Sequence, residues 1–182
     1  MESAKKEILI DLLKQLKDLR WCFISGTAVF FYTNGKRKFN DIDILIHEAD
    51  IDKFAQRIGC KAKKREIQKG NFLLKDYGFK TNFLGQDIEA VTNFPKDVFQ
   101  LNNVKETLEN KNKKIYFGKN FYITSIEELV AQKASMGREK DINDLKLLKG
   151  FSINKELLND FLNVWNTKNK AINLLKRIGY KI

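Results

Sequence analysis

Hydrophobic and polar residues follow two different spacings in the first part of the chain. Residues 5–19 carry leucine and isoleucine three and four positions apart, which predicts an amphipathic helix. The apolar run 21–24 predicts a short strand, which a Ser-Gly-Thr triplet ends, and a helix is expected over 28–32. Residues 41–46 alternate acidic and apolar positions and then become wholly apolar, which predicts a strand whose later half is buried on both faces. A further helix is expected over 50–58.

Between residues 61 and 93 the pattern becomes that of β-strands. Two glycine-containing pairs, Tyr77-Gly78 and Gly85-Gln86, separate apolar runs and predict hairpin turns. A last hairpin is expected further along the chain, around a Gly-Lys-Asn triplet. The expected strands are 72–74, 79–84, 87–91, 115–117 and 121–123.

The last third of the chain has helical spacing throughout. Ser125 and Glu128 predict a capping box at its start, and the polar stretch 96–113 before it is ambiguous. The expected helices are 126–136, 139–149, 154–164 and 168–178. The sequence therefore indicates an α/β part over 1–124, with a mixed sheet flanked by helices, and a helical part over 125–182 packed on it, as one domain or two.

Composition narrows the classes of partner and of site. Lysine and arginine number 34 against 23 acidic residues, a formal net charge of +11 that favours an anionic partner such as a nucleotide or a nucleic acid. Two cysteines and one histidine exclude a disulfide scaffold and an imidazole-rich metal site. The first residues do not resemble a signal peptide and no apolar stretch could span a bilayer, so we expect a cytoplasmic protein without a membrane partner.

The residues with the clearest chemistry are two aspartates on one predicted strand. Asp41 and Asp43 are two positions apart, so their side chains lie on the same face, where they repel each other unless a cation lies between them. Carboxylate oxygens suit Mg²⁺, or Mn²⁺, which completes its shell with phosphates and water. The triplet Ser25-Gly26-Thr27 comes between a strand and a helix, where backbone amides favour phosphate. The alternative is a pair of solvated acids and an ordinary turn.

Together these two segments resemble the signature of the DNA polymerase β-like nucleotidyltransferase superfamily. That signature is a glycine followed by glycine or serine, a short helix, and a strand with Asp-hydrophobic-Asp or Glu. Here Gly26-Thr27 takes the first place, with threonine keeping the hydroxyl of serine, and Asp41 and Asp43 take the second. The segment is most similar to the AbiEii toxin and the 2''-aminoglycoside and lincosamide nucleotidyltransferase branches. The resemblance implies the nucleotidyltransferase fold.

The superfamily takes a third carboxylate from a later strand. Asp87 and Glu89 are the candidates, and they face the same way because they are two apart. We favour Glu89, which lies deeper in its strand, whereas Asp87 stands beside the predicted turn. By resemblance, Asp41, Asp43 and Glu89 would be catalytic and would bind the metal.

A second resemblance to the same branches covers residues 122–145. In those proteins a capped helix carries a lysine, and a basic-acidic motif opens the next helix. By that resemblance Lys133, Arg138 and Lys140 would approach a triphosphate, and two aspartates, Asp141 and Asp144, would tie the helices together by ion pairs. The alternative is a solvated helical hairpin.

Two basic runs are further candidates for binding phosphate. Lys36-Arg37-Lys38 lies close to the predicted aspartate strand, and Lys38 is our candidate there, although basic loop tips are common. The run 61–69 holds five basic residues in nine positions and is read either as a solvated strand and loop or as a track for an RNA backbone.

By resemblance, the chain would transfer a nucleoside monophosphate, with AMP from ATP the favoured case, to an acceptor hydroxyl. Two Mg²⁺ ions would hold the attacking and leaving oxygens of an in-line displacement, the third carboxylate could act as the base, and pyrophosphate would leave along the glycine turn. The acceptor could be a small molecule, a tRNA or a protein, the last two as in a toxin of a toxin–antitoxin pair with a partner protein. A catalytically inactive nucleotide- or nucleic-acid-binding protein of the same fold is the remaining alternative.

Overall fold

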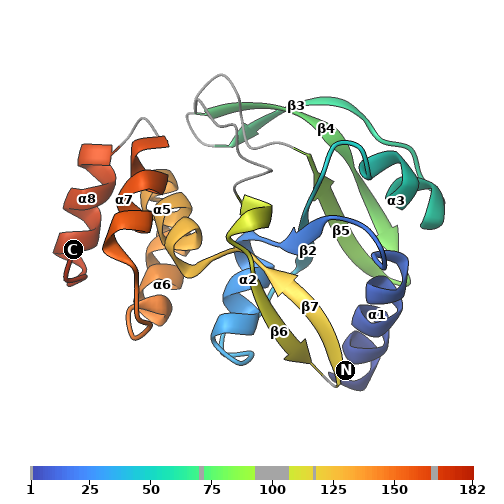
Figure 1. The fold of residues 1–182 in the computed structure, drawn as a ribbon, viewed down its shortest axis with the longest axis horizontal. Coiled ribbons are helices and arrows are strands. Elements are labelled where there is room, and N and C mark those ends of the chain that lie inside the picture. Colours follow the sequence, from blue (N-terminus) through green and yellow to red (C-terminus); the bar gives the residue numbers. More distant parts are fainter. Residues whose placement is uncertain (1, 70–71, 93–106, 117, 165–167) are drawn as a thin grey trace.

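The computed structural model describes residues 2–69, 72–92, 107–116, 118–164 and 168–182. Within these residues one seven-stranded mixed sheet has the order β3-β4-β5-β2-β1-β7-β6 (Figure 1). The strands are β1 (Trp21–Phe23), β2 (Asp41–Ile46), β3 (Lys63–Lys69), β4 (Phe72–Phe83), β5 (Gln86–Val91), β6 (Asn112–Tyr116) and β7 (Lys119–Ile123). The pairs β2–β5 and β1–β7 are parallel and the other four pairs are antiparallel. The predicted mixed sheet is confirmed.

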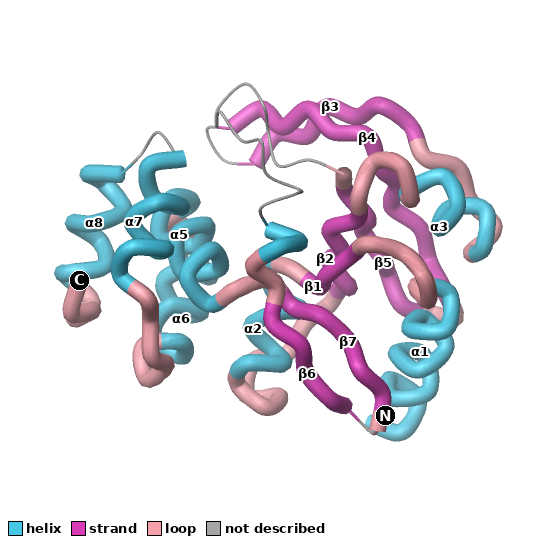
Figure 2. Tube along the Cα trace, in the orientation of Figure 1, coloured by secondary structure: helices cyan, strands magenta, loops and turns pink. Residues whose placement is uncertain are grey.

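Helices come before, between and after the strands. They are α1 (Glu2–Gln15), α2 (Ser25–Tyr32), α3 (Ile51–Arg57), α5 (Ile126–Met136), α6 (Glu139–Leu148), α7 (Lys155–Val164) and α8 (Lys168–Arg177). The last four gather in one group at the left of Figure 2, away from α1 and α3. No helix within the described ranges has both the length and the apolar character needed to cross a bilayer.

The two faces of the sheet pack against apolar clusters of different size. Phe23, Ile42 and Ile44 face one core, which continues through α1 and α3 and into the C-terminal helices. The opposite face carries a smaller apolar cluster of Cys22, Ile24, Leu45 and Val91, against which Leu108 and Tyr122 pack. Since side chains alternate along a strand, Leu45 shares its face with the aspartates of β2. The aspartates therefore lie on the less covered face, beside a buried apolar cluster that joins β1, β2 and β5.

The C-terminal helices form where the sequence predicts them, and α5 lies at their centre. The side chain of Ser125 accepts a hydrogen bond from the amide of Glu128, the first half of the predicted capping box. The Glu128 carboxylate accepts hydrogen bonds from the hydroxyls of Thr107 and Thr124 at 2.6 and 2.7 Å. This buried glutamate therefore ties the start of α5 to the end of β7 and to a helical turn at 107–109.

Several predicted boundaries are wrong. Tyr77-Gly78 is not a turn but the middle of β4, because Gly78 pairs with Lys63 on one side and with Val91 on the other. Helix α2 begins at Ser25, three residues before the predicted start, since the Ser-Gly-Thr triplet forms its first turn. The ambiguous stretch 96–113 contains the turn at 107–109 and the start of β6, while its earlier part lies outside the described residues.

Candidate active site

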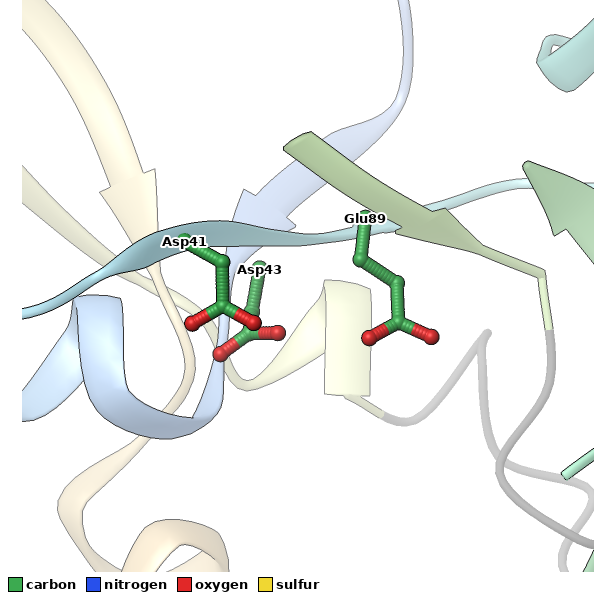
Figure 3. A group of neighbouring side chains, drawn as sticks. All are labelled: Asp41, Asp43 and Glu89. Carbon is green, nitrogen blue, oxygen red and sulfur yellow. The ribbon is translucent and has the colours of Figure 1, made fainter. Parts of the chain in front are cut away.

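Three carboxylates meet on the less covered face of the sheet. Asp41 and Asp43 project from β2, and Glu89 projects from the neighbouring parallel strand β5, where it pairs in register with Asp43. One carboxylate oxygen of each lies within 4.8 Å of the others, and all three residues are half-buried (Figure 3). We call these residues the acidic triad. Three carboxylate oxygens this close together can share in binding divalent ions such as Mg²⁺ or Mn²⁺, which fill their remaining positions with phosphates and water, so the side chains fit such ions.

Asp87, the other candidate for the third carboxylate, is placed elsewhere. It pairs in register with Asp41, but its carboxylate accepts a hydrogen bond from the side-chain amide of Asn82 at 3.0 Å and is exposed. The same Asn82 accepts from the amide of Gly85 in the β4–β5 turn. The structure therefore brings Glu89, and not Asp87, to the two aspartates of β2.

Thr27 fixes the acidic triad to the first turn of α2. Its hydroxyl donates to the carbonyl of Asp41 at 3.3 Å and accepts from the amide of Asp43 at 2.9 Å. The side chain is completely buried, so this hydroxyl serves the backbone of β2. What Thr27 can offer a ligand is its main-chain amide, one of the three in the first helical turn without a partner inside the helix.

The start of α2 has the geometry of an anion site. Ile24, its N-cap residue, makes no side-chain cap, and the amide of Ile24 bonds to the carbonyl of Asp43, which places the helix start next to the triad. Helix N-termini carry a partial positive charge that favours anions. Ser25 has a φ of 52°, a left-handed backbone that serine rarely adopts, and such strain is concentrated at functional sites.

A line of ion pairs with a buried centre runs from the loop after α2 to the C-terminal helices. The Arg37 Nε atom lies 3.1 Å from Asp144, and Lys133 lies 2.8 Å from Asp144 and 3.1 Å from Asp141. Asp141 in turn lies 2.6 Å from the Nε atom of Arg138. We call these five residues the ion-pair ladder. Burial raises the pKa of Asp141, but the hydrogen bond from Arg138 and the charge of Lys133 outweigh it and hold that pKa below its usual value.

Arg37, at one end of the ladder, packs against Gly26 in the first turn of α2, next to the acidic triad. A Cβ atom at this position would lie only 3.3 Å from the Arg37 guanidinium, so the glycine lets that group pack against the first turn of α2. Arg37 also donates to the carbonyl of Lys38. The Arg37 guanidinium, which is paired with Asp144, therefore lies against the helix start that borders the triad.

The predicted phosphate-binding side chains fall into two groups. Lys133 is buried between two aspartates of the ladder, and Arg138, one-third exposed, is bonded to Asp141. Lys38 and Lys140 are exposed and outside the ladder. The predicted ion pairing of Asp141 and Asp144 is present.

Sequence reasoning passed over two arginines. The basic run predicts Lys38 as the phosphate ligand, but alternation with the apolar Phe39 indicates which side faces inward. Arg37 is half-buried and Phe39 is buried, whereas Lys38 is exposed. Arg65, within the basic run on β3, has its Nη2 atom 3.4 Å from Oε1 of Glu89. Only the pairing of three strands brings it there.

A groove of about 520 Å³ lies between the end of α5 and α8, lined by Ala134, Gly137, Lys170, Asn173, Leu174 and Arg177. No residue of the acidic triad lines it. The chemistry described above is therefore on a different part of the surface.

Comparison by sequence finds no related protein, whereas comparison by structure finds several. No protein-family model and no curated protein matches the sequence. By structure, the chain is similar to ANT(2'')-Ia in its crystal complex with adenylyl-2''-tobramycin, with a TM-score of 0.57 and 12% identity over 91% of this chain and 98% of that chain. The solution structure of the same antibiotic-resistance factor gives 0.56 and 13% over 97% and 99%. An antigenic nucleotidyltransferase-like protein from Paracoccidioides brasiliensis gives 0.56 and 15% over 100% and 94%.

Proposed function

We propose that this chain, which has the nucleotidyltransferase fold, transfers a nucleoside monophosphate from a nucleoside triphosphate to an acceptor hydroxyl. The observation that carries the proposal is the acidic triad beside the start of α2. A carboxylate cluster attracts divalent cations and a helix start attracts phosphate, so the two together suit a metal-bound triphosphate.

Each residue near the triad has a role in this proposal. Asp41, Asp43 and Glu89 would hold the divalent ions, Mg²⁺ or Mn²⁺, which when bound neutralise the charge of the phosphates and orient the reacting oxygens. The acceptor oxygen forms a bond to the α-phosphorus while the bond from that phosphorus to the α–β bridging oxygen breaks, and pyrophosphate leaves. The hydroxyl proton passes to Glu89, the triad member on the separate strand β5.

The phosphate side is served by the helix start and by the ladder. The amides of Ser25, Gly26 and Thr27 open α2, and Arg37 lies against them. Arg37, Lys133 and Arg138 against two aspartates leave the ladder with a formal charge of 3 − 2 = +1, which favours an anion at its exposed end. Lys38 and Lys140 are exposed cations that would reach the outer phosphates.

ATP is the proposed donor and AMP the transferred group. One structural neighbour is held in complex with an adenylylated aminoglycoside, which favours adenylyl transfer to the hydroxyl of a small molecule. A tRNA or a protein is the alternative acceptor, and the net charge of +11 is compatible with a polyanion.

The decisive experiment traces the α-phosphate and the γ-phosphate of labelled ATP into separate products. The protein is incubated with Mg²⁺ or Mn²⁺ and ATP labelled at the α- or the γ-phosphate, with an aminoglycoside, with bulk tRNA, or with a protein extract. We expect α-label on one acceptor class and γ-label in pyrophosphate. Binding of ATP without release of pyrophosphate in every arm would mean an inactive nucleotide-binding protein. Transfer that persists in the Asp41→Asn and Asp43→Asn double variant would contradict the proposed site.

A further inference from the structure

An arginine from outside the predicted site reaches the acidic triad. Arg65 lies on β3, two strands away from Glu89, and its Nη2 atom is 3.4 Å from Oε1 of that glutamate. Between them runs β4, where Gly78 stands. A Cβ atom at position 78 would lie 3.1 Å from Arg65 Nη2. The same Cβ would overlap the carbonyl oxygen of Ala90, so the backbone of β5 requires the glycine, which also leaves room for the Arg65 side chain to extend over β4.

The ion pair is well shielded from water. The side chains of Arg65 and Glu89 are 11% and 12% exposed. Water and salt screen a shielded ion pair much less than one at the surface. Arg65 places a positive charge against an oxygen of the triad. The charge of Arg65 therefore changes how strongly the Glu89 carboxylate attracts another cation.

We propose that Arg65 is a positioning residue and internal counter-ion, which holds Glu89 next to Asp43 and competes with a divalent ion for the Glu89 carboxylate. This inference rests on the proposed function of the triad. The guanidinium is attracted by the same negative charge that attracts the metal, and it repels a second cation placed beside it. Ions alone therefore bind weakly, whereas ions that arrive with a triphosphate bring the negative charge that compensates Arg65.

The test measures ion binding without catalysis. Free Mn²⁺ is titrated by its electron paramagnetic resonance signal, at low ionic strength and without nucleotide, against the wild type and the Arg65→Gln variant. A neighbouring opposite charge changes the proton affinity of a carboxylate by about 10- to 1,000-fold. By the same electrostatics we expect Arg65→Gln to bind Mn²⁺ more tightly, by roughly tenfold or more.

Two matched variants separate the charge of Arg65 from its packing. Arg65→Lys keeps the charge and should restore the Mn²⁺ affinity of the wild type. Lys64→Gln removes one positive charge from the same strand, but its side chain projects to the other face, and it should leave the affinity unchanged. Thermal unfolding of each variant verifies that the fold is kept.

The outcomes distinguish this inference from the proposed function. An Arg65→Gln variant that is folded and binds Mn²⁺ no more tightly than the wild type overturns the inference, as does an equal gain in Lys64→Gln. If Mn²⁺ binding by the wild type is unaffected by Asp41→Asn and Asp43→Asn together, the triad is not the ion site and the proposed function itself is wrong.

Discussion

The acidic triad and the ion-pair ladder are built from the same residue types but differ in balance and burial. The triad with Arg65 counts three carboxylates against one cation, a formal charge of −2, and its members are half-buried. The ladder alternates three cations with two aspartates, and its central Lys133 is 2% exposed. An excess of one sign calls for a ligand of the other sign, whereas each aspartate in the buried centre of the ladder is paired with cations of the protein itself. We infer that the triad serves chemistry and that the buried centre of the ladder, Lys133 with its two aspartates, serves architecture.

The largest effect is expected on the triad. Asp43→Asn should lower nucleotidyl transfer by about 1,000-fold, because the charge stabilisation supplied by a bound ion amounts to several kcal/mol. The fold should be kept, since the change removes one of three mutually repelling carboxylates. Initial rates with α-labelled ATP measure the first effect and thermal unfolding measures the second.

The matched control for this comparison is Asp87→Asn. It removes a carboxylate from β5, two positions from Glu89, that is hydrogen-bonded to Asn82 and lies outside the triad. We expect its rate to stay within about threefold of the wild type, since exposed substitutions have small effects. Equal losses in the two variants would mean that general surface charge, and not the triad, drives the rate.

The ladder should respond in the opposite way, through stability. Lys133→Met leaves Asp141 and Asp144 without their shared cation inside the protein, and breaking a buried ion pair costs about 3–5 kcal/mol. Urea unfolding measures this loss. In the double variant with Asp144→Asn the two losses should not add, because the residues share one network. A loss under about 1 kcal/mol for Lys133→Met is typical of a surface substitution and would contradict the role of this lysine as a buried ion-pair partner.

A local pattern predicts the two aspartates of the triad, and the resemblance to the nucleotidyltransferase superfamily implies its third carboxylate. Alternation along one strand places Asp41 beside Asp43, and Glu89 could be preferred over Asp87 from its depth in the next strand. The four C-terminal helices were equally predictable, because each has its own apolar stripe. The two aspartates and the four helices need no knowledge of which strands pair, whereas the place of Glu89 beside Asp43 depends on the pairing of β2 with β5.

The contacts that the sequence did not reveal all join distant segments. The contact of Arg65 with Glu89 requires the register of three strands, and Gly78 leaves space beside the Arg65 guanidinium. Arg37 finds Asp144 more than 100 positions away. Glycine favours turns, so the pattern at Tyr77-Gly78 predicts one, but pairing on both sides of β4 overrides that local preference.

A smaller effect of the ladder should appear in acid. The pKa of Asp141 is lowered in the folded protein, so its contribution to stability is present above the pKa of the unfolded state and is lost as the pH falls through the folded value. The free energy of unfolding of the wild type should therefore decrease below about pH 4, near the unfolded pKa of an aspartate. Asp141→Asn should remove part of this dependence in urea titrations at several pH values.

Asp50 supplies the control for that measurement. Its pKa is also lowered, mainly by a hydrogen bond from Arg20, but this pair lies at the surface with Arg20 54% exposed. Surface ion pairs contribute about 0–1 kcal/mol, so Asp50→Asn should flatten the acid dependence less than Asp141→Asn does. The reverse order would mean that the ladder is not the main source of the acid sensitivity.

The smallest expected effect is a change in stability that compares the left-handed backbone beside the triad with the one beside the ladder. Ser25 beside the triad and Gly137 beside the ladder have similar left-handed backbones, with φ of 52° and 61°. A side chain in this conformation costs about 1–2 kcal/mol, and glycine loses about 0.5–1 kcal/mol of entropy on folding. Ser25→Gly should therefore stabilise the protein by roughly 0.5–1 kcal/mol and Gly137→Ala should destabilise it by a similar amount, since a Cβ at Gly137 meets nothing closer than 3.7 Å. Urea unfolding of both variants gives the values. If Ser25→Gly is the less stable protein, the serine side chain supports the fold, and the strain at the start of α2 cannot be assigned to the active site.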